Sequence, residues 1–164
     1  APNVIPEVDR MHLFQNSGIN SYPLVLLGEG GSGKSVLASQ FFERLAGDHN
    51  ELTLFLACSR VPSTANLNTH DQVDRALANA LGQEGFGIKE LVKMAHIGSL
   101  VIDTIDLLLS EDSSPAILEV LTDLANETRL VVTCRKREWK DHLEQLPNYG
   151  FTPFHVPLLD KEKL

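Results

Sequence analysis

Four residues between Gly28 and Ser35 follow the pattern G-x-x-x-x-G-K-[ST], whose residue types and spacing suit the binding of phosphate groups. Main-chain N–H groups can converge on a phosphate only where no Cβ blocks the approach, and a following helix adds the positive end of its dipole. Lys34 would place a cation against the β- and γ-phosphates, and Ser35 would offer its hydroxyl to Mg²⁺. The alternative is a glycine-rich turn without a ligand. An apolar run before the pattern and a helical pattern after it favour phosphate binding.

Two aspartates in the stretch "LVIDTID" could complete such a site. Asp103 ends a buried run, where an unpaired carboxylate is costly unless a cation faces it. We therefore expect Asp103 to reach Mg²⁺ through water or Ser35, although an aspartate after a strand can also cap a turn. Asp106 has two interpretations that the residues leave open. It could orient the water that attacks a γ-phosphate, or cap the next turn.

A third polar group lies in "LVVTCRKREW", where Thr133, Cys134 and Arg135 end another apolar run. At the carboxyl end of a strand, Thr133 and Arg135 would face the same crevice as the aspartates. Arg135 could sense the γ-phosphate or brace a neighbouring domain by bidentate pairing. The basic residues that follow are expected to form a solvated cluster: Lys136, Arg137 and Lys140.

The elements that must position these residues alternate between short apolar runs and helical patterns. The runs predict strands at 22–28, 52–58, from 99 onward, 129–135 and 152–159. The periodic segments predict helices at 33–45, 68–82, 87–98, 113–127 and 138–146. Strands separated by helix-length segments require crossovers, so the pattern predicts an α/β fold with a mostly parallel sheet covered on both faces. Ligands of such sheets bind at the carboxyl ends of the strands.

Length and composition limit the classes of function. The chain has 164 residues, of which 43% are hydrophobic and 22% charged, which suits one globular domain. Its formal net charge of −8 disfavours non-specific nucleic-acid binding. No run approaches the roughly 20 apolar residues of a membrane span.

Cys58 and Cys134 are expected to be buried thiols in a reducing compartment. The sequence at both ends suggests one domain, residues 1–164, of a longer protein.

At these residues the chain resembles a known family. "GEGGSGKS", "LVIDTID" and "LVVTCR" resemble the two nucleotide motifs (Walker A and Walker B) and the arginine-bearing sensor strand of the STAND ATPases, signal-transducing relatives of the AAA+ proteins. The NACHT branch is the most similar and the NB-ARC group is a near alternative. The resemblance implies a P-loop NTPase three-layer sandwich whose five-stranded parallel sheet has the order 5-1-4-3-2.

The resemblance also implies roles and cofactors. It assigns Asp106 as the hydrolytic acid and Arg135 as the sensor, and it pairs Ser35 with Asp103 as holders of Mg²⁺. Segment 3–14 resembles the part that packs beside adenine, so the implied ligands are ATP and ADP. The implied phosphate-binding residues are Gly30, Gly31, Ser32, Gly33, Lys34, Ser35 and Val36.

One departure suggests slow chemistry. Most AAA+ enzymes have a glutamate directly after the metal aspartate, whereas Thr104 occupies that position here. The resemblance therefore implies a weak ATPase that acts as a cytoplasmic switch and oligomerises through the full-length protein, with effector and sensor domains outside this chain. Two other classes are considered. A small-molecule P-loop kinase is disfavoured by the few arginines after Asp103. An AAA+ ATPase that acts on nucleic acid is disfavoured by the negative net charge of the chain.

Overall fold

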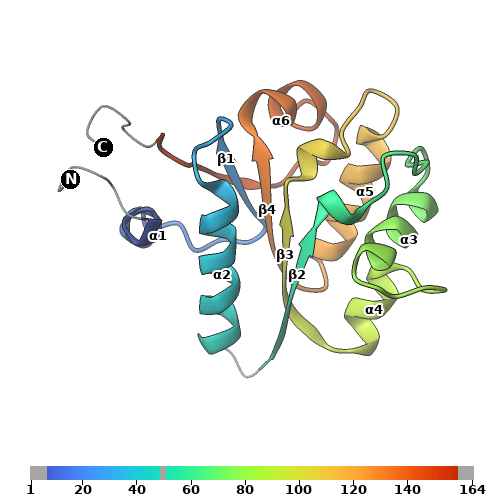
Figure 1. Ribbon diagram of the computed structural model, residues 1–164, viewed down its shortest axis with the longest axis horizontal. Coiled ribbons are helices and arrows are strands. Elements are labelled where there is room, and N and C mark those ends of the chain that lie inside the picture. Colours follow the sequence, from blue (N-terminus) through green and yellow to red (C-terminus); the bar gives the residue numbers. More distant parts are fainter. Residues whose placement is uncertain (1–6, 49–50, 159–164) are drawn as a thin grey trace.

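The chain folds as one all-parallel five-stranded sheet with helices on both faces (Figure 1). The computed structural model describes residues 7–48 and 51–158. The strand order β2-β3-β4-β1-β5 is the expected 5-1-4-3-2 order read from the opposite edge. The strands are β1 (Leu24–Gly28), β2 (Leu52–Ala57), β3 (Ile97–Asp103), β4 (Arg129–Arg135) and β5 (Thr152–His155). The predicted α/β fold and its sheet order are confirmed.

Of the six α-helices and two short 3₁₀ turns within the described residues, the first helix precedes β1 and the others connect the strands. The helices are α1 (Glu7–Asn16), α2 (Lys34–Asp48), α3 (His70–Ala80), α4 (Ile88–Met94), α5 (Ser114–Ala125) and α6 (Lys136–His142). The 3₁₀ turns are η1 (Cys58–Arg60) and η2 (Ile105–Leu107). Two of these elements follow their strands without a loop, because η1 begins directly after β2 and α6 directly after β4.

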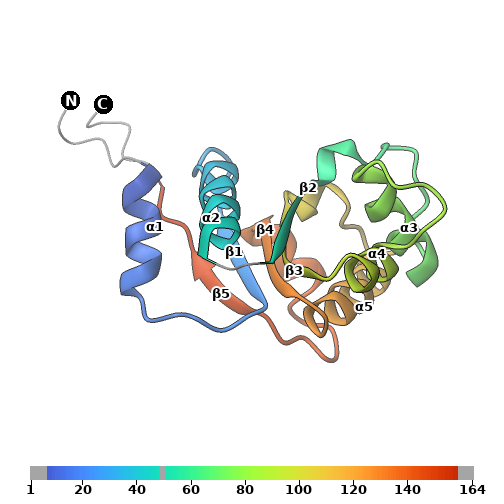
Figure 2. The same cartoon turned by 90° about the horizontal axis from the view of Figure 1, so that it is seen from below.

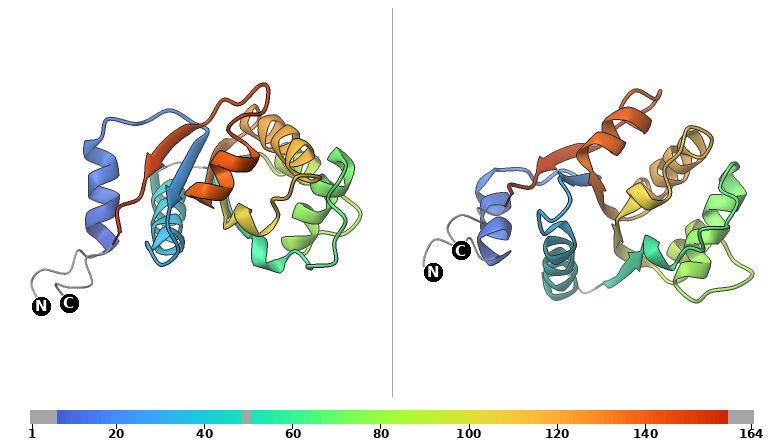
Figure 3. Two further views of the ribbon diagram at one scale, coloured as in Figure 1. Left: turned by 90° about the horizontal axis from the view of Figure 1, so that it is seen from above. Right: turned by 45° about the horizontal axis from the view of Figure 1, so that its top comes forward.

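Alternation along the strands divides the core into two clusters, one on each face of the sheet. In β1, Leu24 and Leu26 pack with the residues of α1 and α2, whereas Val25 and Leu27 belong to the cluster under α3 to α6. Successive strand residues point to opposite faces, so a strand buried on both sides needs apolar residues at every position. Figures 2 and 3 show the resulting layers, with α1 and α2 on one side of the strands and α3, α4 and α5 on the other.

Helix α1 was not predicted from the periodicity of the sequence. It packs against α2, and Phe14 makes edge-to-face contacts with Phe41 of α2 and Phe154 of β5. Its residues 7–14 belong to the 3–14 segment that resembles an adenine-binding region, and residues 3–6 of that segment lie outside the described residues. Within the described part, Met11 and Phe14 contribute to the core.

Several element ends differ from the prediction. The helix expected at 87–98 ends at Met94, because the chain reverses at His96, whose φ of +52° is left-handed, and Ile97 already pairs with β2. The prediction took Gly98 as the helix stop, but a histidine supplies the turn instead. The strand expected at 152–159 ends at His155, and Leu159 lies outside the described residues.

Candidate functional site

Sheet topology brings the predicted groups together at the carboxyl ends of three neighbouring strands. Strand β4 lies between β3 and β1. Its last residue, Arg135, is in register with Gly28, where β1 passes into the glycine-rich loop. On its other side, β4 reaches Asp103 at the end of β3 through a hydrogen bond from Thr133. The loop, the two aspartates and the arginine therefore share one edge of the sheet, which is where α/β folds bind ligands.

The glycines of the loop meet two separate requirements. Gly31 and Gly33 have φ values of +80° and +84°, a conformation that residues with a Cβ rarely adopt. A Cβ added to Gly31 would meet no atom within 4 Å, so the loop is open on that side. At Gly28, in contrast, a Cβ would lie 2.5 Å from Ser32 Oγ. Gly28 therefore permits close packing beneath the loop, whereas Gly31 and Gly33 permit its curvature.

The loop opens onto a cavity of about 350 Å³. Six of the seven predicted phosphate-binding residues line it, and so do Asp106 and Arg135. Thr104 and Leu107 complete the lining. The exception is Ser32, whose side chain is fully buried and whose hydroxyl has no hydrogen-bond partner among the described residues. Ser32 can therefore contribute to this cavity only through its main chain.

Lys34 bends back over the loop. Its Nζ donates a hydrogen bond of 2.8 Å to the carbonyl oxygen of Glu29, which also accepts the N–H of Ser32 at 3.1 Å. Burial lowers the pKa of Lys34, while the neighbouring carboxylates of Asp106 and Asp103 favour its charged form. The ammonium group, which lines the cavity, is thus partly desolvated, and its attraction to an anion is screened less than that of a fully exposed lysine.

Asp106 and Arg135 form a pair beside the loop. The backbone N–H of Arg135 donates to Asp106 Oδ1 at 3.1 Å, and Arg135 Nε lies 3.8 Å from Oδ2. Only 7% of the Asp106 side chain is exposed, compared with 58% for Arg135. A Cβ added to Gly30 would lie 3.7 Å from Arg135 Nη2, so the guanidinium extends from Asp106 to the loop.

Asp103 is not among the residues that line the cavity, and it is 8% exposed. Its Oδ1 accepts a hydrogen bond of 2.6 Å from Thr133, whose hydroxyl in turn accepts the N–H of Thr104 at 2.7 Å. Thr104 adopts a left-handed conformation with φ +63° and ψ +51°. Sequence reasoning placed Thr133 at the crevice without giving it a role. The signal was a polar residue at the end of an otherwise apolar strand.

The residues present fit a nucleotide with a divalent cation. Asp103 is a nearly buried carboxylate, and within residues 7–48 and 51–158 its one hydrogen-bond donor is the Thr133 hydroxyl. Carboxylate and hydroxyl oxygens are ligands that Mg²⁺ prefers, and the loop cavity is lined by Ser35 and by Thr104, the residue after Asp103. Lys34 and the open loop supply the positive charge and the unblocked main chain that phosphate groups require.

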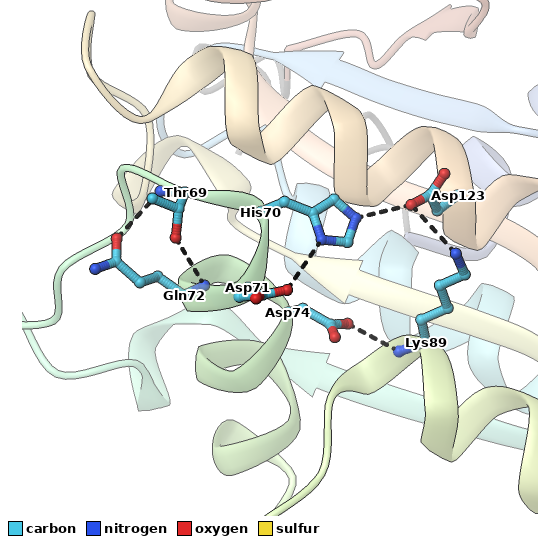
Figure 4. Close-up of polar contacts among 7 residues, drawn as sticks. All are labelled: Thr69, His70, Asp71, Gln72, Asp74, Lys89 and Asp123. Atoms are coloured by element: carbon cyan, nitrogen blue, oxygen red, sulfur yellow. Dashed lines mark hydrogen bonds and ion pairs between the residues drawn. The ribbon is translucent and has the colours of Figure 1, made fainter.

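A second polar cluster joins α3, α4 and α5 on the other face of the sheet (Figure 4). His70 Nε2 lies 2.8 Å from Asp123 Oδ2, and Lys89 Nζ lies 3.6 Å from the same oxygen. Asp74 accepts the backbone N–H of Lys89 at 3.0 Å. The hydrogen bond to Asp123 raises the pKa of His70 against the opposing effect of burial. These contacts join α3 to α4 and both helices to α5. None of the residues lines the loop cavity, so we assign the cluster a structural role.

Two further features bear on the class of protein. Cys58 and Cys134 are free and buried, and burial raises the pKa of both thiols. Among the helices within residues 7–48 and 51–158, none combines the length and apolar character that crossing a bilayer requires.

Comparison with known proteins identifies one matching family. The family model of the NACHT domain matches residues 22–162. A comparison with curated proteins gave no match.

Solved structures with a similar fold include domain III of the replication initiation protein DnaA from Thermotoga maritima, with a TM-score of 0.58, 17% identity and coverage of 96% of this chain and 63% of that one. AMPPCP-bound DnaA from Aquifex aeolicus has a TM-score of 0.55, 14% identity and coverage of 94% and 46%. Drosophila ORC bound to DNA has a TM-score of 0.55, 17% identity and coverage of 89% and 41%. The chain thus spans between 41% and 63% of the length of these structures, and at such identities the similarity concerns the fold.

Proposed function

Because the chain belongs to the NACHT domain family, we propose that it binds ATP and ADP with Mg²⁺ and acts as a slowly hydrolysing switch domain of the STAND class. The observation that carries this proposal is the convergence of Lys34, Asp106 and Arg135 on the cavity that the glycine-rich loop opens. The AMPPCP-bound state of the DnaA structure, which shares the fold, supports adenine as the base.

The loop residues have distinct roles in the proposal. Main-chain N–H groups from Gly30 to Val36 bind the phosphates, and α2 adds the positive end of its dipole. Lys34 exchanges its hydrogen bond to the Glu29 carbonyl for phosphate oxygens. Ser35 and Asp103 hold Mg²⁺, which neutralises charge on the triphosphate when bound.

Hydrolysis in this proposal is attack of water on the γ-phosphorus, with cleavage of the bond to the β–γ bridging oxygen and release of ADP and inorganic phosphate. Asp106 orients that water and accepts its proton. Arg135, next to both Asp106 and Gly30, contacts the γ-phosphate and senses its presence. Thr104 follows Asp103 and has no carboxylate to assist, so we expect slow turnover.

The biological part of the proposal rests on the family. We propose that residues 1–164 form the nucleotide-binding domain of a longer protein in which exchange of ADP for ATP drives oligomerisation, with sensor and effector domains elsewhere. Differential contact with the γ-phosphate would shift the balance between two domain arrangements. The two buried free thiols are compatible with a reducing compartment such as the cytoplasm.

One observation favours a second candidate, a small-molecule kinase. A cavity of about 630 Å³ between η1 and the segment after η2 shares Leu107 with the loop cavity, so a phosphoryl acceptor could bind beside the nucleotide. Action on nucleic acid has support only in the fold that the chain shares with proteins such as DNA-bound ORC, and the net charge of −8 opposes it. Plain phosphate release supports the switch, phosphoryl transfer from ATP to sugars or nucleosides supports the kinase, and phosphate release stimulated by DNA supports action on nucleic acid.

Calorimetric titration of ATP and ADP tests the leading proposal. We expect Lys34→Ala to weaken binding by about 100-fold, because hydrogen bonds to charged groups contribute about 1.5–3 kcal/mol each. Lys140→Ala removes an exposed lysine of α6 as a matched control and should leave affinity unchanged. Undiminished ATP affinity in a folded Lys34→Ala protein would refute the proposed site.

A further inference from the structure

Thr133 connects the end of β3, where Asp103 lies, with the turn that leads to Asp106. It is fully buried near the end of β4, where its hydroxyl lies 2.6 Å from Asp103 Oδ1 and 2.7 Å from the backbone nitrogen of Thr104. No other side chain described here contacts both the last residue of β3 and the residue that starts the following turn by hydrogen bonds.

The direction of these hydrogen bonds follows from the chemistry of the groups. An amide N–H can only donate, so the hydroxyl oxygen of Thr133 accepts from Thr104. An ionised carboxylate can only accept, so the single hydroxyl proton goes to Asp103 Oδ1. This relay occupies one carboxylate oxygen and leaves the other available to a ligand, and it holds a side chain that is only 8% exposed in one orientation.

The hydrogen bond from the Thr104 N–H to Thr133 also supports an unusual backbone conformation at Thr104. Thr104 is β-branched and left-handed, a conformation that places its Cβ close to the following carbonyl oxygen. The conformation has a consequence for the acids. In a continuous strand, Asp103 and Asp106 would point to opposite faces, because side chains alternate with a period of two. The turn at Thr104 instead starts η2, which carries Asp106 to the cavity.

We propose that Thr133 is a positioning residue for the cation. Its hydroxyl orients Asp103 towards Mg²⁺ and fixes the turn that presents Asp106, so that both carboxylates are placed before the nucleotide arrives. This inference rests on the proposed function, since it concerns the cation that accompanies the nucleotide. A valine at position 133 would keep the shape of the side chain and remove the relay.

The test compares ATP affinity in Mg²⁺ with ATP affinity in EDTA, measured by calorimetry. We expect Thr133→Val to lower the Mg²⁺-dependent gain in affinity by about 10-fold and to leave the metal-free affinity within about 2-fold, because the substitution removes a hydrogen bond to the carboxylate and none to the phosphates. Thr133→Ser retains the hydroxyl and should restore the gain. Thr53→Val is the matched control, because Thr53 lies in β2 and its hydroxyl has no partner among the described residues.

Each outcome is informative. An unchanged Mg²⁺-dependent gain in Thr133→Val overturns the inference, and so does an equal loss of affinity with and without Mg²⁺, which indicates a purely structural role. If Thr133→Val does not fold, the same comparison is made in a Thr104→Gly background, where glycine relieves the left-handed strain. Absence of ATP binding by the unmodified protein would overturn the proposed function, and this inference with it. If the wild-type protein binds ATP and gains affinity from Mg²⁺, the proposed function stands, and the Thr133→Val result then tests the positioning role of Thr133 alone.

Discussion

Arg135 contacts Asp106 through its backbone and its side chain at once, with the N–H 3.1 Å from Oδ1 and Nε 3.8 Å from Oδ2. The two contacts differ in kind. The guanidinium is 58% exposed, so its charge attraction is screened by solvent and contributes little to stability. The backbone contact involves a main-chain group at the end of a central strand and fixes the position of the carboxylate. Asp106 is therefore held in place even when the arginine side chain turns towards a ligand.

Asp106→Asn should separate catalysis from binding. The amide keeps an oxygen that can accept the Arg135 N–H, but it cannot take a proton from water. We expect the rate of phosphate release from ATP to fall by at least about 100-fold, while ATP affinity changes by less than about 3-fold. Single-turnover phosphate release measures the first quantity and calorimetry the second. Asp112→Asn, at an exposed acid shortly after η2, is the control and should keep the full rate. A full rate in Asp106→Asn would assign this residue to the turn alone.

Gly31→Ala should impair binding without greatly harming the fold. Gly31 has φ +80°, and an added Cβ would meet no atom within 4 Å, so the cost is mainly conformational, about 1–2 kcal/mol in the free energy of unfolding. Gly85→Ala provides a matched control, because Gly85 has φ +81° and equal free space but does not line the cavity. Urea unfolding should give similar losses for both variants. Calorimetry should show weaker ATP binding for Gly31→Ala only, and equal affinities would mean that the loop does not hold the phosphates.

The His70–Asp123 pair should make stability depend on pH. Because the hydrogen bond to Asp123 raises the pKa of His70 in the folded protein, the stabilisation is fully present below the unfolded pKa of about 6.5. It is lost as the pH rises through the folded value. Solvent screening limits the effect to less than about 1 kcal/mol. The other charged groups that face His70 or Asp123 are Asp71, Asp74, Glu119 and Lys89.

Urea unfolding at pH 5.5 and pH 8.5 measures this dependence. We expect His70→Gln to lose more stability at pH 5.5 than at pH 8.5, relative to the unmodified protein. His12→Gln, at an exposed position of α1, is the control and should lose equal amounts at both values. If His70→Gln loses the same stability at both pH values, folding does not raise the pKa of His70, and the prediction is wrong.

The parts of the structure that could be predicted from the sequence are those with local causes. The strands at β1 and β4 follow from apolar runs, and the cavity follows from glycines at fixed spacing before Lys34. The sheet order came from the family resemblance, because an apolar run such as that of β4 does not specify its neighbours. The role of Thr133 depends on its alignment with Asp103, 30 residues away in sequence. The pairing of His70 with Asp123 spans 53 residues and leaves no periodic signal.

Strand β4 passes into α6 with no intervening loop, and Arg135 is the residue at this junction. Helix α6 is anchored by Trp139, which is fully buried and donates a hydrogen bond of 2.6 Å to the hydroxyl of Tyr149. This anchor holds the helix that begins directly after the peptide unit in contact with Asp106. The position of the Asp106 carboxylate therefore depends on the packing of α6 as well as on the sheet, because the main-chain N–H that holds it lies where strand and helix meet.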